Sequence, residues 1–88
     1  MEVDQILENR EVTHGDFEIK AMWIQEIMEH LIGLNAYQNM EADKKESIHM
    51  ILVKLSRILY GDPDHKDHWD DIAGYAELIA NRLKDNKL

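Results

Sequence analysis

Hydrophobic residues recur every three or four positions along most of this chain, which is the period of an amphipathic helix. The pattern predicts helices over about residues 3–9, 17–34, 44–60 and 67–83, and it contains no strand signal. Helices joined by short connections are typical of a small antiparallel bundle. We therefore expect residues 1–88 to form one all-α domain, a helical bundle with three long helices and a short N-terminal helix.

Polar residues mark the expected ends of these helices. Asp16 is placed to cap the helix at 17–34, and Asp43 with Glu46 three residues later has the spacing of a capping box. Gly61 ends the helix at 44–60, and Pro63 biases the residue before it away from helix. The connections are therefore predicted to be short turns.

Two helices carry more apolar surface than one core face requires. In the helix at 17–34, Met22 and Trp23 lie beside the main stripe. The helix at 44–60 has a primary stripe of six apolar residues: Ile48, Ile51, Leu52, Leu55, Ile58 and Leu59. Its second apolar face consists of Met50, Val53 and Tyr60. Since a helix that is apolar on two sides is normally buried between neighbours, we expect a homo-oligomer formed through Met22 and Trp23 or through this second face.

The last predicted helix has an apolar face that is rich in alanine. Small residues permit close approach of a neighbouring helix. The face comprises Trp69, Ile72, Ala73, Ala76, Ile79, Ala80 and Leu83.

Composition narrows the functional classes. The net charge of −8 and the isoelectric point of about 4.9 argue against direct nucleic-acid binding, because phosphate attraction cannot come from the overall field. With no cysteine there are no disulfides or thiolate metal sites, which fits a reducing compartment. No signal peptide and no apolar run of about 20 residues is present. We expect a cytoplasmic protein without a membrane segment.

An acidic turn leads into the last predicted helix. Residues 62–71 contain five aspartates and two histidines. These groups are possible ligands for a divalent cation, and His65 and His68 have the one-turn spacing that zinc sites use, without a third ligand fixed by sequence. Aspartates at a helix start also complement the helix dipole and satisfy free N–H groups. This capping explanation accounts for most of the aspartates.

Five side chains around this helix are candidates for ligand binding: Lys54, Arg57, Asp67, Asp71 and Tyr75. Asp71 shares a helix side with Tyr75, while Lys54 and Arg57 lie one turn apart on the preceding helix, where they are placed to hold phosphate oxygens. The same cations could instead pair with Asp67 or Asp71. A surface ion pair or a helix interface is therefore the competing interpretation.

Glu26 and Glu29 form an E-x-x-E pair of the kind found in helical, magnesium-binding nucleotide pyrophosphatases. Both glutamates project away from the main stripe and face solvent unless a second subunit covers them. With Asp67 and Asp71 they are the weak candidates for a magnesium site. No Gly-rich phosphate loop, G-x-S-x-G motif or cysteine nucleophile is present, so covalent catalysis is not expected.

Three stretches together resemble a family of small, uncharacterised phage and prophage proteins. They are His14-Gly15-Asp16-Phe17, residues 52–58 with the K-x-x-R pair, and residues 67–75 with the D-x-W-x-D-I-A-G-Y motif. The first stretch departs from the family pattern in having His14 where tyrosine is usual. The helical pattern is also distantly similar to MazG-like nucleotide pyrophosphatases, which implies a role in deoxynucleotide handling, in the host cytoplasm, with magnesium as the cofactor.

Two functions follow as hypotheses. The first is a nucleotide-binding or nucleotide-hydrolysing protein of phage origin. The second is a non-enzymatic acidic module that binds a host or phage protein. Convergence of Asp67 and Asp71 with Glu26 or Glu29 in one cleft, within one chain or between two subunits, would favour the first, whereas scattered carboxylates would favour the second.

Overall fold

The computed structural model describes residues 12–85, with side chains to residue 84, and this part of the chain is helical without any strand. The helices are α2 (Phe17–Ile32), α3 (Asn35–Gln38), α4 (Ala42–Tyr60) and α5 (Lys66–Asp85). Residues 12–14 are also helical. The all-α prediction is confirmed, and three long helices lie close to their predicted bounds. The helix predicted at 3–9 falls outside the described residues.

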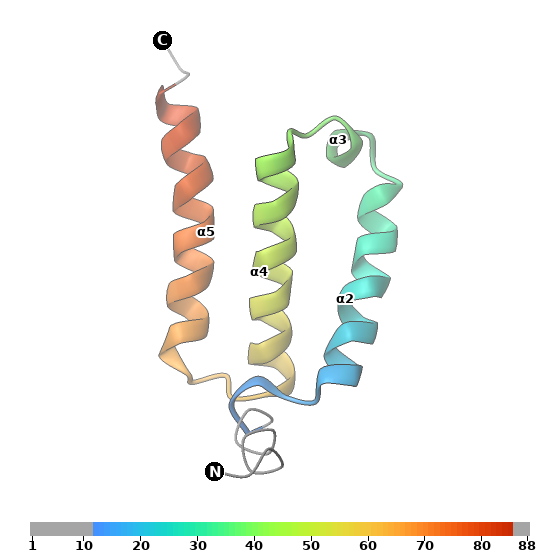
Figure 1. Cartoon of the computed structure of the whole chain (residues 1–88), viewed down its shortest axis with the longest axis vertical. Helices are drawn as coiled ribbons and strands as arrows, with labels where there is room; N and C mark the ends of the chain where they lie inside the picture. The colour runs from blue at the N-terminus through green and yellow to red at the C-terminus, as the bar shows by residue number, and fades with distance from the viewer. Residues whose placement is uncertain (1–11, 86–88) are drawn as a thin grey trace.

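The three long helices lie side by side in a single layer, with α4 in the middle (Figure 1). Helix α4 packs against both α2 and α5, and the short helix α3 connects α2 to α4. Neighbouring long helices run antiparallel, as predicted. Within the expected small bundle, the outer helices α2 and α5 lie on opposite sides of α4. A single layer has no second layer against which to enclose a core.

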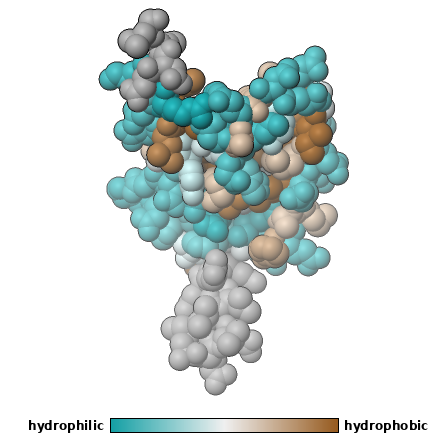
Figure 2. Space-filling view, turned by 45° about the horizontal axis from the view of Figure 1, so that its top comes forward, coloured by the Kyte–Doolittle hydropathy of each residue, from teal (hydrophilic) through white to brown (hydrophobic). Residues whose placement is uncertain are grey.

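Few apolar side chains are buried as a result. Among the described residues only Ile24 and Ile58 are buried apolar side chains. Hydrophobic patches remain visible between hydrophilic flanks on the surface shown in Figure 2. The exposed large apolar side chains include Phe17, Ile19, Met22, Ile32, Leu59, Trp69, Leu78 and Leu83. Within residues 12–85, no helix is both long and apolar enough to cross a membrane.

The helix ends follow the predicted chemistry in two of three places. Asp16 caps α2 by accepting a hydrogen bond from the Ile19 amide at 3.1 Å, and Gly61 ends α4. The capping box at Asp43 was predicted wrongly, because α4 begins earlier and its N-cap, Glu41, makes no side-chain cap bond. Asp43 lies within the first turn of α4, where its carboxylate accepts a hydrogen bond from a distant arginine.

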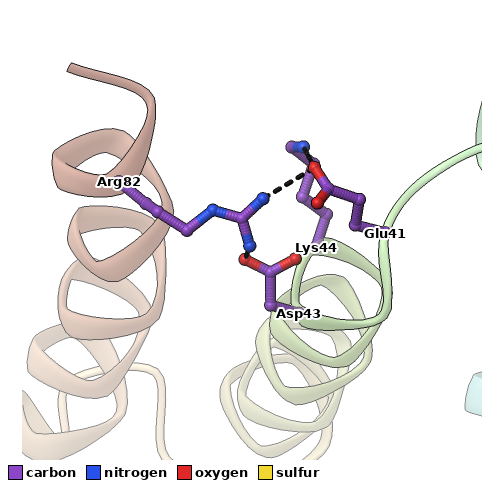
Figure 3. Close-up of polar contacts among 4 residues, drawn as sticks. All are labelled: Glu41, Asp43, Lys44 and Arg82. Carbon is purple, nitrogen blue, oxygen red and sulfur yellow. Dashed lines mark hydrogen bonds and ion pairs between the residues drawn. The ribbon is translucent and has the colours of Figure 1, made fainter. Parts of the chain in front are cut away.

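That arginine is Arg82, which ties the far end of α5 to the start of α4 (Figure 3). Its guanidinium donates one hydrogen bond to Asp43 and another, at 2.6 Å, to Glu41, which also pairs with Lys44 at 2.8 Å. The hydrogen bond from Lys44, followed by the positive charge of Arg82, lowers the pKa of Glu41. One guanidinium therefore holds two carboxylates from a neighbouring helix.

Replacing Arg82 by alanine is expected to lower the melting temperature by about 4 °C, the shift of a domain this size for a change of about 1 kcal/mol. Thermal unfolding followed by circular dichroism at pH 7 measures it, with Lys84→Ala on the same exposed turn as the control. Because salt screens partly exposed ion pairs, the difference should shrink in 1 M NaCl. Equal melting temperatures for both variants would show that this contact adds nothing.

Candidate functional site

The candidate site lies at the end of the layer where α2 begins, α4 ends and α5 begins (Figure 1). The chain is closely packed here. Gly15 has φ +86°, and a Cβ at this position would lie 2.4 Å from the carbonyl oxygen of Tyr60. A Cβ at Gly61 would lie 2.5 Å from the carbonyl oxygen of Thr13. Two glycines thus allow residues 13–15 to cross directly against the end of α4.

The Thr13 carbonyl connects three segments. It accepts a hydrogen bond from the Asp62 amide at 3.0 Å and another from His68 Nε2 at 3.0 Å. His68 is 2% exposed, so its ring is committed to this structural bond. The start of α5, the turn after α4 and the segment before α2 are therefore held together by one backbone oxygen.

Three imidazole rings gather around this junction. The centroid of His14 lies 5.0 Å from that of His68 and 6.1 Å from that of His65, and those of His65 and His68 are 4.6 Å apart. No group of three histidine or carboxylate side chains within residues 12–84 is arranged to hold a metal ion. The one-turn spacing of His65 and His68 therefore serves packing and hydrogen bonding here.

Two basic side chains face a groove between α2 and α4 next to the imidazoles. Lys20 is 8% exposed, and Arg57 has a buried Nε without a hydrogen-bond partner. The groove encloses about 250 Å³. It is lined by Phe17, Lys20, Ala21, Ile24, Gln25, His49, Val53, Ser56 and Arg57. A cationic, half-apolar groove has thus formed in a strongly acidic chain.

The positive charge at this end is reflected in the titration of its neighbours. Burial, and then the charges of Arg57 and His68, lower the pKa of His14 to about 4. The Nδ1 atom of His14 is buried without a hydrogen-bond partner. His14 is therefore a neutral imidazole at pH 7, held among cations.

Lys54 forms an ion pair with Asp71 at 2.9 Å, and its side chain is only 11% exposed. This contact confirms the predicted pairing between these helices. The hydrogen bond from Lys54 is the main cause that lowers the pKa of Asp71, and the charge of Arg57 acts in the same direction. Lys54 is bonded to this carboxylate, whereas Arg57 Nε has no hydrogen-bond partner among the described residues.

Asp67 and Tyr75 lie away from the groove. Asp67 is exposed, and its carboxylate lies 3.8 Å from His65 Nε2. Tyr75 and Asp71 border an open surface on α5 of about 550 Å³ that also carries the carboxylates of Asp70 and Glu77. Three carboxylates and no cationic side chain border this surface, so it does not favour a phosphate.

The four magnesium candidates do not converge within one chain. Glu26 and Glu29 are exposed on α2, whereas Asp67 and Asp71 belong to α5 on the other side of α4 (Figure 1). Among the residues described, a magnesium centre built from these four carboxylates therefore does not fit a single protomer.

Comparison with known proteins shows one family. Residues 2–83 match a domain of unknown function, DUF6378. The chain belongs to the DUF6378 family. No curated protein and no solved structure matches the chain. The expectation that the chain belongs to a family of unknown function is confirmed. The link of this DUF6378 chain to phage proteins and to MazG-like enzymes stays a prediction.

Sequence reasoning missed Lys20 and His14 as members of the site of this DUF6378 chain. Lys20 lies one turn before Ile24 on the side of α2 that meets α4. A lysine within an apolar stripe was therefore the sequence feature that could have indicated its role. His14 carried a weaker signal, its place directly before the Gly15-Asp16 turn. Neither position could be connected to Arg57 without knowing how the helices pack.

Proposed function

We propose that this DUF6378 chain binds a small phosphorylated ligand, a nucleotide, in the groove between α2 and α4. The observation that carries the proposal is that Arg57 lines this groove in a chain of net charge −8, while its Nε is buried without a hydrogen-bond partner. Buried donors without partners are rare in native proteins, and phosphate oxygens are among the strongest acceptors for a guanidinium. Lys20 adds a second positive charge on the opposite wall.

The remaining lining suits the uncharged part of a nucleotide. Phe17 is 80% exposed at the mouth of the groove, where its ring is available for stacking on a base, and Ile24 and Val53 supply an apolar wall. A volume of about 250 Å³ is below the usual size range of drug-like ligand pockets, which starts near 300 Å³. The expected ligand is therefore no larger than a nucleoside phosphate, part of which projects into solvent.

Binding without hydrolysis is the form of the proposal that the side chains support. Asp71 is paired with Lys54, and Glu26, Glu29 and Asp67 lie apart from the groove lining. Magnesium-dependent turnover would require carboxylates brought together from more than one chain. An origin in phage and a cytoplasmic setting accompany the nucleotide hypothesis through the resemblance described above.

Isothermal titration calorimetry tests the proposal, with nucleoside mono- and triphosphates and inorganic phosphate, each with magnesium and with EDTA. We expect a nucleotide to bind and Arg57→Gln to weaken binding at least tenfold, because a charged hydrogen bond to phosphate is lost. Lys66→Gln is the matched control, since it removes one positive charge from an exposed position outside the groove. Absence of nucleotide binding, or an equal loss in both variants, would refute the groove as a phosphate site.

A non-enzymatic interaction module is the second candidate function. It is favoured by the scatter of the acidic side chains within one chain and by the exposed apolar residues. The same titrations distinguish a nucleotide-binding protein from an interaction module when the release of phosphate or pyrophosphate is also measured. Nucleotide binding with release of phosphate or pyrophosphate would support an enzyme, whereas absence of both would leave the interaction module as the better explanation.

A further inference from the structure

One broad face of the helix layer is apolar, and among the described residues no further helix packs over it. On α4 it consists of a stripe spaced four, three and four residues apart: Ile48, Leu52, Leu55 and Leu59. On α5 it consists of a stripe spaced four, three, four and three residues apart: Trp69, Ala73, Ala76, Ala80 and Leu83. This alternation of three and four is the seam along which helices pack in bundles and coiled coils.

Both stripes lie on the side of the layer opposite the candidate site. At about 100° per residue, the α4 stripe is centred roughly half a turn from Arg57, and the α5 stripe is similarly opposite Asp71. The Lys54–Asp71 ion pair and the charge of Arg57 on Asp71 place these polar groups together on one face. The two apolar stripes therefore share the other face.

The α4 and α5 stripes are distinct from the seams that pack inside the chain. Helix α5 packs against α4 through a second stripe, which includes the buried His68 and extends to Arg82. On α4 the residues on this side include Lys54 and the buried Ile58. On these two stripes Leu59 is 61% exposed, Trp69 is 52% exposed and the three alanines are exposed, whereas Ile48, Leu52 and Leu55 are partly buried. No charged residue interrupts either stripe.

We propose that this face binds the same face of a second copy of the chain, so that two α4–α5 hairpins form a four-helix bundle. The inference is independent of the nucleotide proposal. It places the interface on the primary stripe of α4, a different surface from the Met22 and Trp23 region or the second α4 face expected from sequence.

The stripes are complementary to each other in size. The α4 stripe carries four large aliphatic side chains, whereas the middle of the α5 stripe is three alanines. In a two-fold dimer, α4 of one copy lies over α5 of the other, and large side chains enter the space left by small ones. In such a dimer the large side chains of each α4 therefore pack against the alanines of the other copy's α5.

The available area is also sufficient. Helices α4 and α5, each about 30 Å long and about 10 Å wide, present roughly 600 Å² in projection, so two copies would bury about 1,200 Å² in total, the lower end of the range for specific interfaces. With only two buried apolar side chains among its described residues, the protomer gains its missing second layer in this way.

Sedimentation equilibrium of the full chain tests the proposal at protein concentrations from 5 to 200 μM, chosen as roughly the range in which specific dimers form. The expected mass is twice the 10.4 kDa of one chain, with a melting temperature that rises with concentration. A monomer across this range, at constant melting temperature, would overturn the dimer and leave the face to another kind of partner.

The discriminating variant is Ala76→Glu. Ala76 is exposed in the single chain, so glutamate there is harmless to a monomer but places a charge inside the proposed bundle. Asn81→Glu adds the same charge to the opposite side of α5, on the open surface next to Leu78. We expect Ala76→Glu to be monomeric or to lose helix content, and Asn81→Glu to remain a folded dimer. A dimer retained by Ala76→Glu would contradict the proposed interface.

Discussion

Replacing Gly15 by alanine is expected to lower the free energy of unfolding by about 3 kcal/mol or more. Two effects add. A φ of +86° is unfavourable for any residue with a Cβ, at a cost of about 1–2 kcal/mol. The new methyl group would also lie 2.4 Å from the Tyr60 carbonyl oxygen, which is backbone and cannot turn aside. The segment before α2 must then move away from the end of α4, with a further cost typical of overpacking.

Urea unfolding at a fixed protein concentration measures this change, since the concentration also affects an oligomer. Gly74→Ala is the matched control, because Gly74 is exposed on α5 and a Cβ there meets nothing within 4 Å. Alanine is a better helix former than glycine, so the control should be more stable by about 0.5–1 kcal/mol. The same substitution thus has opposite signs at the two sites. A Gly15→Ala protein as stable as the wild type would show that residues 13–15 do not pack as described.

The local structure was largely predictable from sequence, and its assembly was not. Helical periodicity and the Asp16 and Gly61 signals are properties of neighbouring residues, and α2, α4 and α5 appear where these signals placed them. The arrangement in one layer depends on which of several apolar stripes meets a neighbour. Helix α4 has apolar residues almost all round, so its periodicity could not identify the sides that face α2 and α5.

The same distinction between local signals and helix packing explains which residues of the candidate site could be predicted from sequence. The Lys54–Asp71 pair could be predicted, because opposite charges on helices joined by a short turn come within reach. Arg57 was predicted as a candidate as well, but its neighbours Lys20 and His14 come from more than 30 residues earlier in the chain. Their proximity depends on the crossing of residues 13–15 against α4, which Gly15 and Gly61 permit only in the folded chain.

Lowering the pH from 7.5 to 5 is expected to reduce the free energy of unfolding by about 1–2 kcal/mol through His14 alone, after allowance for its partial exposure. Burial and the charges of Arg57, His68 and Lys20 lower the pKa of His14 to about 4, against which only the Thr13 backbone acts. The unfolded chain has the ordinary value of 6.5. Between these values the unfolded state binds more protons, so stability falls as the pH falls from 6.5 towards 4.

His14→Tyr isolates this contribution, because tyrosine does not titrate between pH 5 and 7.5. Chemical unfolding at half-unit pH steps should show a smaller loss of stability for the variant than for the wild type. The pKa values of Asp71 and Glu41 are lowered in the folded chain, so these two ionised carboxylates also stabilise the fold. That stabilisation is lost at a lower pH than the His14 contribution, because it decreases only once the pH falls below the ordinary carboxyl pKa values near 4. Their effect is common to both proteins. The difference between the two curves above pH 5 therefore belongs to His14, and parallel curves would mean that its imidazole is free to take up a proton in the folded chain.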